Sequence, residues 1–91
     1  MMLNIEITHR YKKSYALAKK RGLPMEELDN VVKMLAEEQV LPEKYLDHAL
    51  HGKYDGLREC HIRPNWLLVY SIEDVLKILY LIDTGSHSDL F

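Results

Sequence analysis

Two turn signals divide the last third of the sequence into strand-like segments. Pro64-Asn65 and Glu73-Asp74 are residue pairs that favour turns, and the segments 57–62, 66–72 and 75–84 around them are rich in Ile, Leu, Val and Tyr. Such short connections predict antiparallel pairing between neighbouring strands. This part of the chain therefore requires a fold built around a sheet.

The first part of the chain predicts one more strand and a helix. Residues 3–7 alternate weakly between apolar and polar side chains, which indicates a strand, and Thr8 offers a cap for the helix that follows. Gly22 supplies a stop for that helix. The helix carries an apolar stripe at helical spacing, made of Tyr11, Tyr15 and Ala18.

A second helix is predicted from Pro24, which suits the first turn of a helix. Its apolar residues follow the i, i+3, i+4, i+7 pattern and are Leu28, Val31, Val32 and Leu35. With only Gly22 and Leu23 between them, the two helices are expected to form an antiparallel hairpin. The stretch from Pro42 to Asp55 is interpreted as a loop. The expected order is β-α-α-β-β-β, an α+β fold in which an antiparallel-rich sheet carries the helical hairpin on one face.

Length and composition predict one domain over residues 1–91. The hydrophobic content of 47% is enough for a core that buries roughly 60 to 70% of the unfolded surface. The single cysteine, Cys60, cannot form an internal disulfide, and no apolar run approaches the ~20 residues of a membrane span. We therefore expect a cytoplasmic protein with no membrane partner.

Positive charge is concentrated in the first predicted helix. The net charge of the chain is −2, which gives no overall attraction for nucleic acid, but residues 8–24 carry six Lys or Arg and no acid. The residues from 26 to 39 are acidic instead. The basic helix could attract phosphate, or it could simply be a solvated face. The candidate RNA-binding residues here are Lys12, Lys13, Lys19, Lys20 and Arg21.

Histidines are the chemically most informative residues of the second half. Imidazole can take and give a proton near neutral pH, so several imidazoles on one surface suit acid-base catalysis. Side chains alternate across a strand, which places Glu59 and His61 on one face and Cys60 on the other. The alternative is an exposed polar face without chemistry. The four histidines of this half are His48, His51, His61 and His87.

Several spaced blocks of sequence, taken together, resemble one family. They are Asp47-His48-Ala49-Leu50, Gly52, Arg58-Glu59-Cys60-His61-Ile62, Pro64-Asn65-Trp66, Val69-Tyr70, and the stretch from Thr84-Gly85-Ser86-His87 to Leu90-Phe91. These blocks are similar to the YafQ branch of the RelE-type bacterial toxins, and so is the element order. The resemblance implies a type II toxin-antitoxin ribonuclease that enters the ribosomal A site, cuts mRNA and is silenced by a cognate antitoxin.

The resemblance also implies the site residues. They are the catalytic candidates His48, Glu59, His61, Asn65 and His87, with Phe91 as the aromatic residue that stacks on a base. Glu59 and Asn65 stand where the family usually has aspartate, so Glu59 keeps the charge and Asn65 loses it. Asp83 stands where relatives often have arginine, so a phosphate clamp is absent at that position. His9 and His51 have no matching family position.

Metal-independent RNA cleavage needs a base for the 2′-hydroxyl, an acid for the leaving 5′-oxygen and positive charge around the transition state. We assign His87 as the acid and His48 as the base. His61 is the alternative base or a charge stabiliser, and Glu59 orients an imidazole. No cofactor is expected. Zinc on the His48-x-x-His51 pair is not expected either, because paired-cysteine and His-Glu-x-x-His motifs are missing.

Two other function classes share this architecture. A ParE-like toxin would bind DNA gyrase and need no histidine cluster, and a co-repressor would act only when bound to antitoxin. The three matched histidines favour the ribonuclease. The expected partners are the cognate antitoxin and the ribosome with its mRNA and ribosomal RNA. The toxin is expected to be monomeric when free and oligomeric with antitoxin.

Overall fold

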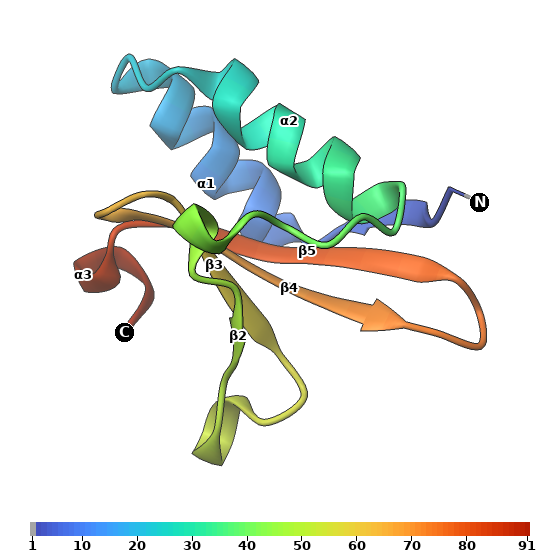
Figure 1. The fold of residues 1–91 in the computed structure, drawn as a ribbon. Coiled ribbons are helices and arrows are strands. Elements are labelled where there is room, and N and C mark those ends of the chain that lie inside the picture. Colours follow the sequence, from blue (N-terminus) through green and yellow to red (C-terminus); the bar gives the residue numbers. More distant parts are fainter. Residues whose placement is uncertain (1) are drawn as a thin grey trace.

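The computed structural model describes residues 2–91, which form a five-stranded sheet with the two longer helices on one side (Figure 1). The strands are β1 (Asn4–Ile7), β2 (His48–Ala49), β3 (Arg58–Arg63), β4 (Trp66–Glu73) and β5 (Ile78–Gly85). Their order in the sheet is β1-β5-β4-β3-β2. β1 pairs with β5 in parallel, and the other neighbours are antiparallel, so the predicted α+β class and antiparallel-rich sheet are confirmed.

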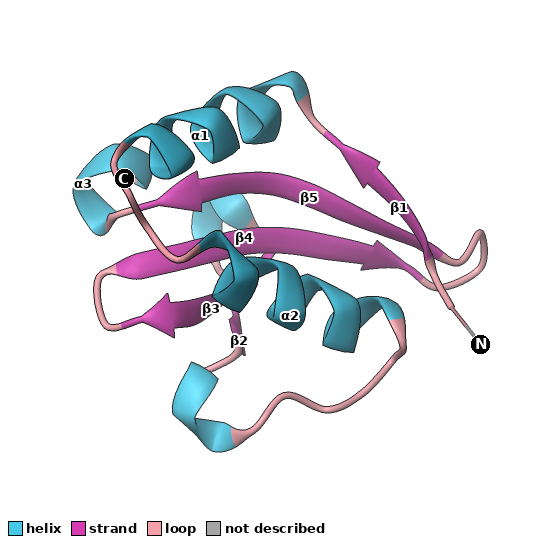
Figure 2. Cartoon of the chain, turned by 90° about the horizontal axis from the view of Figure 1, so that it is seen from above, coloured by secondary structure: helices cyan, strands magenta, loops and turns pink. Residues whose placement is uncertain are grey.

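Two helices cover one face of the sheet and run in opposite directions (Figures 1 and 2). They are α1 (His9–Lys20) and α2 (Met25–Ala36). The predicted cap of α1 is confirmed, because the Thr8 hydroxyl accepts a hydrogen bond from the backbone N–H of Tyr11. Gly22, with φ of +79°, lies in the turn between the helices. The hairpin is tied by the Tyr15 hydroxyl, which donates to the carboxylate of Asp29 at 3.0 Å.

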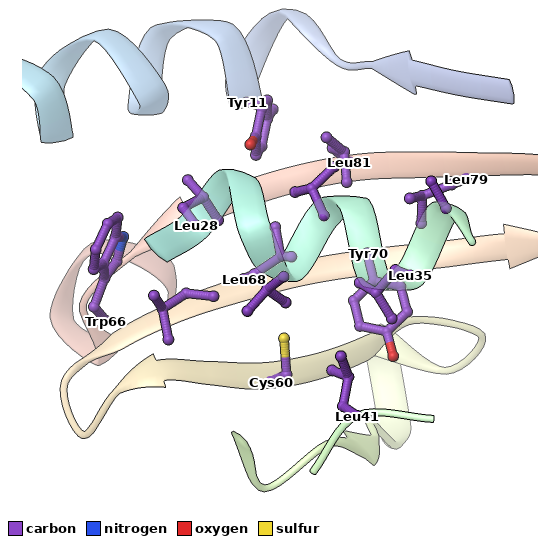
Figure 3. Close-up of a cluster of buried hydrophobic side chains, with 14 of the residues drawn as sticks. Tyr11, Leu28, Leu35, Leu41, Cys60, Trp66, Leu68, Tyr70, Leu79 and Leu81 are labelled. Carbon is purple, nitrogen blue, oxygen red and sulfur yellow. The ribbon is translucent and has the colours of Figure 1, made fainter. Parts of the chain in front are cut away.

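The hydrophobic core lies between these helices and the sheet (Figure 3). The apolar stripe predicted for α2 is buried as expected and meets side chains from alternate positions of β3, β4 and β5. Cys60 belongs to this core and is fully buried. The buried residues contributed by the strands include Cys60, Ile62, Trp66, Leu68, Tyr70, Leu79 and Leu81.

Two local predictions need correction, and one element was not predicted. The stretch from Pro42 to Asp55 is more ordered than a loop, since it contains two 3₁₀ turns (Glu43–Tyr45 and Gly52–Tyr54) and β2. β5 begins at Ile78 rather than Val75, because the preceding residues form an exposed turn in which Lys77 has a φ of +57°. The last residues form a short helix, α3 (His87–Leu90), that the sequence analysis did not predict.

Among residues 2–91, every helix is too short or too polar to span a lipid bilayer.

Candidate active site

The face of the sheet opposite α1 and α2 carries the catalytic candidates. Residues paired across strands place their side chains on the same face, and Glu59 pairs with Val69 while His61 pairs with Leu67. Cys60 lies between them in sequence and points into the core, so the predicted alternation along β3 is confirmed. Glu59 is only 4% exposed, which is more burial than a simple solvated sheet face would give. A buried carboxylate calls for a compensating partner.

β2 brings His48 to Glu59. The two-residue strand pairs with β3 so that His48 lies directly opposite Glu59, and His48 Nε2 is 3.7 Å from Glu59 Oε1. On the other side of its ring, His48 Nδ1 lies 2.6 Å from the carbonyl oxygen of Leu46. A carbonyl only accepts hydrogen bonds, so Nδ1 carries the proton and Nε2 is free in the neutral ring.

His61 is oriented in the same way. Its Nδ1 lies 3.3 Å from the carbonyl oxygen of Pro64, which assigns the proton to Nδ1, and its Nε2 lies 3.5 Å from Glu59 Oε1. The ring centroids of His48 and His61 are 6.3 Å apart. One buried carboxylate oxygen therefore faces the free nitrogens of two imidazoles, and it attracts the positive charge that either ring gains with a proton.

The short helix α3 brings His87 to the other side of His61. Ser86 caps this helix: its hydroxyl accepts from the N–H of Asp89, whose carboxylate accepts from the N–H of Ser86. These bonds lower the pKa of the Asp89 carboxyl, with a further contribution from Arg21. The His61 and His87 ring centroids are 5.8 Å apart. His61 is thus the central ring of a row of three.

Phe91 follows α3 and lies beside the same cluster. Its ring centroid is 6.4 Å from that of His87 and 5.1 Å from that of Tyr54, with an edge-on arrangement to Tyr54. Tyr54 was not predicted as a site residue, because an isolated tyrosine in a loop carries no motif. Tyr54 and Phe91 together form an aromatic wall beside His87.

Asn65 holds the start of α3. Its side-chain oxygen accepts a long hydrogen bond of 3.4 Å from the backbone N–H of His87. The amide is exposed and lies in the turn between β3 and β4. The structure therefore gives Asn65 a contact with the backbone of a catalytic candidate, which an asparagine oxygen makes without a charge.

A partly buried network supports the segment that carries His48. Asp47 accepts a 2.6 Å hydrogen bond from the Tyr70 hydroxyl and forms a 3.2 Å ion pair with Arg58. Burial is the main reason that the pKa of the Tyr70 phenol is raised. The network joins the segment before β2 to the middle of β4.

The predicted RNA-binding cations do not converge on the histidines. Lys12, Lys13, Lys19 and Lys20 are exposed on α1, in the helical layer on the opposite face of the sheet. Arg21 is different, because it forms a 3.2 Å ion pair with Asp89 of α3. Phe91 is the one member of the predicted RNA-binding set that lies against a catalytic candidate in the described residues 2–91. His51 lies just before the second 3₁₀ turn, and His9 is the exposed first residue of α1.

Three of the catalytic candidates also form a potential metal site. The ligand atoms of Glu59, His61 and His87 lie within 4.8 Å of one another. Imidazole nitrogen and carboxylate oxygen are suitable donors for transition metals such as zinc or copper. The His48-x-x-His51 pair considered from the sequence does not belong to this group.

Three imidazoles in a row around a buried carboxylate, with an aromatic wall at one end, define an acid-base site of the kind that a metal-independent ribonuclease needs. The family described as "Bacterial toxin of type II toxin-antitoxin system, YafQ" matches residues 3–91. The chain belongs to this family of RelE-like toxins.

Relatives and solved structures agree with this assignment. The mRNA interferase toxin YafQ of Escherichia coli K12 is 37% identical over 89 residues, which cover 97% of this chain and 95% of the relative. A metal-bound toxin from Helicobacter pylori superposes with a TM-score of 0.93 at 43% identity, covering 99% of this chain and 100% of the other. The E. coli DinJ-YafQ toxin-antitoxin complex contains a chain that superposes with a TM-score of 0.91 at 36% identity, covering 100% and 99%.

Proposed function

We propose that this protein is a ribosome-dependent endoribonuclease, the toxin of a type II toxin-antitoxin pair, that cleaves translated mRNA by acid-base catalysis. The observation that carries the proposal is the row of His48, His61 and His87 around the buried Glu59. The name of the E. coli relative, an mRNA interferase, supports the same activity.

The order of the rings supports a division of roles. In-line cleavage places the base and the acid on opposite sides of the phosphorus, and His48 and His87 are the outer members of the row. His48 Nε2 takes the proton of the 2′-hydroxyl, and His87 gives a proton to the leaving 5′-oxygen. His61, between them, stabilises the charge of the transition state. Glu59 stabilises the imidazolium that forms when His48 accepts the proton.

Metal binding at this site would inhibit the proposed cleavage rather than catalyse it. A metal held by Glu59, His61 and His87 would occupy one ring nitrogen of the proposed acid, His87, and one of the central imidazole. The Helicobacter pylori relative was solved as a metal-bound toxin. We therefore expect cleavage to persist in a strong chelator and to fall when zinc or copper is added.

A cognate antitoxin is the proposed partner. The E. coli relative was solved as a DinJ-YafQ toxin-antitoxin complex, and the chain in it covers nearly the whole of this one. The free toxin is proposed to be a cytoplasmic monomer that becomes oligomeric with its antitoxin. The exposed cationic face of α1 is a surface that a disordered, partly acidic segment can wrap while it folds.

The test uses mRNA on programmed ribosomes with the wild type and alanine variants of the three histidines. We expect the wild type to cleave the mRNA and the His87→Ala variant to cleave it about 10² to 10⁴-fold more slowly. Replacing the 5′-oxygen of the leaving group by sulfur removes the need for an acid. Cleavage of this substrate by His87→Ala should return towards the wild-type rate, while cleavage by His48→Ala should stay slow.

Two results would contradict the proposal. Equal cleavage by the wild type and His87→Ala would remove His87 as the acid. A wild type that leaves mRNA intact on ribosomes but inhibits DNA gyrase would favour the ParE-like alternative.

A further inference from the structure

The proposed cleavage site needs a cation for the phosphate, and the nearby guanidinium groups are already paired. Positive charge around the phosphorus is a major source of rate enhancement in phosphoryl transfer. Arg58 is paired with Asp47, and Arg63 donates two hydrogen bonds to the carboxylate of Glu27. Arg21, as described above, is paired with α3. Arg10 also forms an ion pair, but its side chain is 70% exposed, more than those of Arg21, Arg58 and Arg63.

Strand pairing and a shared hollow place Asp83 toward the histidine row. Val69 in β4 pairs with Glu59 on one side and with Asp83 on the other. The β4–β5 register shifts next to this pair, and Asp83 lines one small hollow together with Val69, Tyr54 and Phe91, which places it toward the histidine row. Two strand spacings separate the backbones of Glu59 and Asp83, a distance of about 10 Å.

Asp83 is a fixed and almost completely covered carboxylate. Its side chain is 8% exposed, and it accepts a 2.5 Å hydrogen bond from the Ser14 hydroxyl and a 2.8 Å bond from the N–H of Thr84. Its other oxygen lies 2.8 Å from Nε of Arg10. Asp83 therefore anchors the Arg10 side chain at the edge of β5.

Arg10 is held through one nitrogen and presents the others to solvent. Its side chain is 70% exposed, and Asp83 is the one residue among 2–91 with which it forms an ion pair or side-chain hydrogen bond. It lines a hollow of about 400 Å³ with Asn65 and Ser86, next to His87 in sequence. It also lines a small hollow of about 50 Å³ with Tyr54 and Phe91.

The location of Arg10 in α1 is unfavourable for helix stability. The first turn of a helix has a positive end dipole that disfavours cations by roughly 0.3 to 1 kcal/mol, and α1 has no acidic residue in that turn. Arg10 therefore does not stabilise α1 through the helix dipole. A role in binding an anion is a better explanation for a cation at this position.

We propose that Arg10 binds an RNA phosphate beside the histidine row and that Asp83 is its positioning residue. The inference rests on the proposed cleavage of RNA and adds the group that receives the phosphate. The free Nη groups form a planar fork that suits two phosphate oxygens, while the base next to that phosphate stacks on Phe91. Arg10 belongs to the basic helix but was not predicted as a site residue, because Asp83 is 73 positions away in the chain.

The test combines cleavage on ribosomes with binding of an uncleavable 2′-deoxy trinucleotide, followed by NMR titration. Arg10→Gln should slow cleavage by about 10²-fold and weaken trinucleotide binding, and Arg10→Lys should recover part of both because it keeps the charge without the fork. Lys33→Gln is the matched control, since it removes one exposed charge from α2 and should match the wild type.

Asp83→Asn tests the positioning role. It should raise KM by several-fold, and it should add no further loss when combined with Arg10→Gln, since the two residues act as one unit. A purely structural role for Asp83 would lower the melting temperature and give additive losses in cleavage.

The possible failures can be told apart. If Arg10→Gln cuts mRNA and binds the trinucleotide like the wild type, the inference is wrong while the proposed function stands. If the wild type binds the trinucleotide in an Arg10-dependent way but cuts no mRNA, the inference stands and the proposed function is wrong.

Discussion

At the residue scale, the burial of Glu59 beside two imidazoles predicts an electrostatic role for its carboxylate in the proposed chemistry. Glu59→Gln keeps the shape and removes the charge that faces His48 and His61. We expect cleavage to fall by about 10²-fold, because the imidazolium formed in the transition state loses its counter-charge. Steady-state cleavage of ribosome-bound mRNA measures this loss.

Glu59→Asp is the control for the charge. It keeps the carboxylate on a shorter arm and should retain much more activity than the amide, with a similar melting temperature in both variants. If the amide variant is as active as wild type, Glu59 has no electrostatic role.

Cys60, the neighbour of Glu59 on the strand, has no place in the chemistry. It is fully buried, and burial raises the pKa of its thiol from its ordinary value near 9 to about 12. The folded thiol stays neutral while the unfolded thiol ionises, so this contribution to stability is complete below pH 9 and is lost as the pH rises from 9 towards 12.

A thiol reagent at pH 8 should therefore label Cys60 only as fast as the protein unfolds. Cys60→Ser should destabilise the fold by about 1 to 3 kcal/mol, since it buries a hydroxyl, and should leave the rate of cleavage by the folded protein unchanged. Fast labelling of the native protein would contradict the buried location.

At the element scale, α3 is too short to be stable by itself, and it depends on its cap. Ser86→Ala removes the hydroxyl that receives the N–H of Asp89, at a cost of about 0.5 to 2 kcal/mol to the local helix. Fraying of α3 displaces His87 and Phe91 while the sheet stays folded. Cleavage should thus fall by roughly 10-fold or more, with only a small change in melting temperature.

Ser88→Ala is the matched control for α3. Ser88 is an exposed serine in the same helix and has no cap bond, so its loss should change neither activity nor stability. Equal activity of Ser86→Ala and Ser88→Ala would show that the cap does not position His87.

Element-scale patterns also explain what the sequence could and could not predict. The α2 stripe was predictable because it repeats the helical period, and the three long strands were predictable because turn signals separate segments rich in Ile, Leu, Val and Tyr. β2 has two residues and therefore no period, yet it places His48 opposite Glu59. The Ser86-x-x-Asp89 spacing was the available signal for α3, a capping box with aspartate in place of the usual glutamate or glutamine.

The same limit applied to predicting which candidate site residues lie close together: only local patterns could be used. Alternation along β3 predicted that Glu59 and His61 share a face, which is a local property. The row of three histidines depends on sheet order and on the turn before α3, neither of which a local pattern contains. The resemblance to a family supplied the residues of the site, and the structure supplied their arrangement.

At the scale of the whole molecule, the core and the site are coupled through Tyr70. Its ring packs in the core (Figure 3) and its hydroxyl donates to Asp47, next to His48. Tyr70→Phe should cost about 1.5 to 3 kcal/mol, the range for a hydrogen bond to a charged group, and should lower cleavage by loosening the segment that carries His48. Denaturant unfolding and cleavage assays measure the two effects.

Tyr80→Phe is the control for that coupling. Tyr80 lies in β5 and its hydroxyl has no hydrogen-bond partner among residues 2–91, so its loss should leave both properties close to wild type. If Tyr70→Phe lowers stability without affecting cleavage, the segment before β2 is positioned by other contacts.

The molecule also separates the four lysines of α1 from the proposed catalytic face, which predicts separate roles for these lysines in binding and for the histidines in chemistry. Lys12, Lys13, Lys19 and Lys20 lie in the helical layer, and the histidines lie on the far face of the sheet. If these lysines contact ribosomal RNA, each contributes slightly less than one unit to the slope of log affinity against log salt concentration. Removing one lysine should reduce the slope by that amount. Replacing all four by glutamine should therefore weaken ribosome binding and flatten its salt dependence.

Cleavage at saturating ribosome concentration should stay near the wild-type rate, because none of the four lysines lies beside an imidazole. A fourfold variant that binds ribosomes normally but cuts slowly would place these lysines in the chemistry and would contradict the separation.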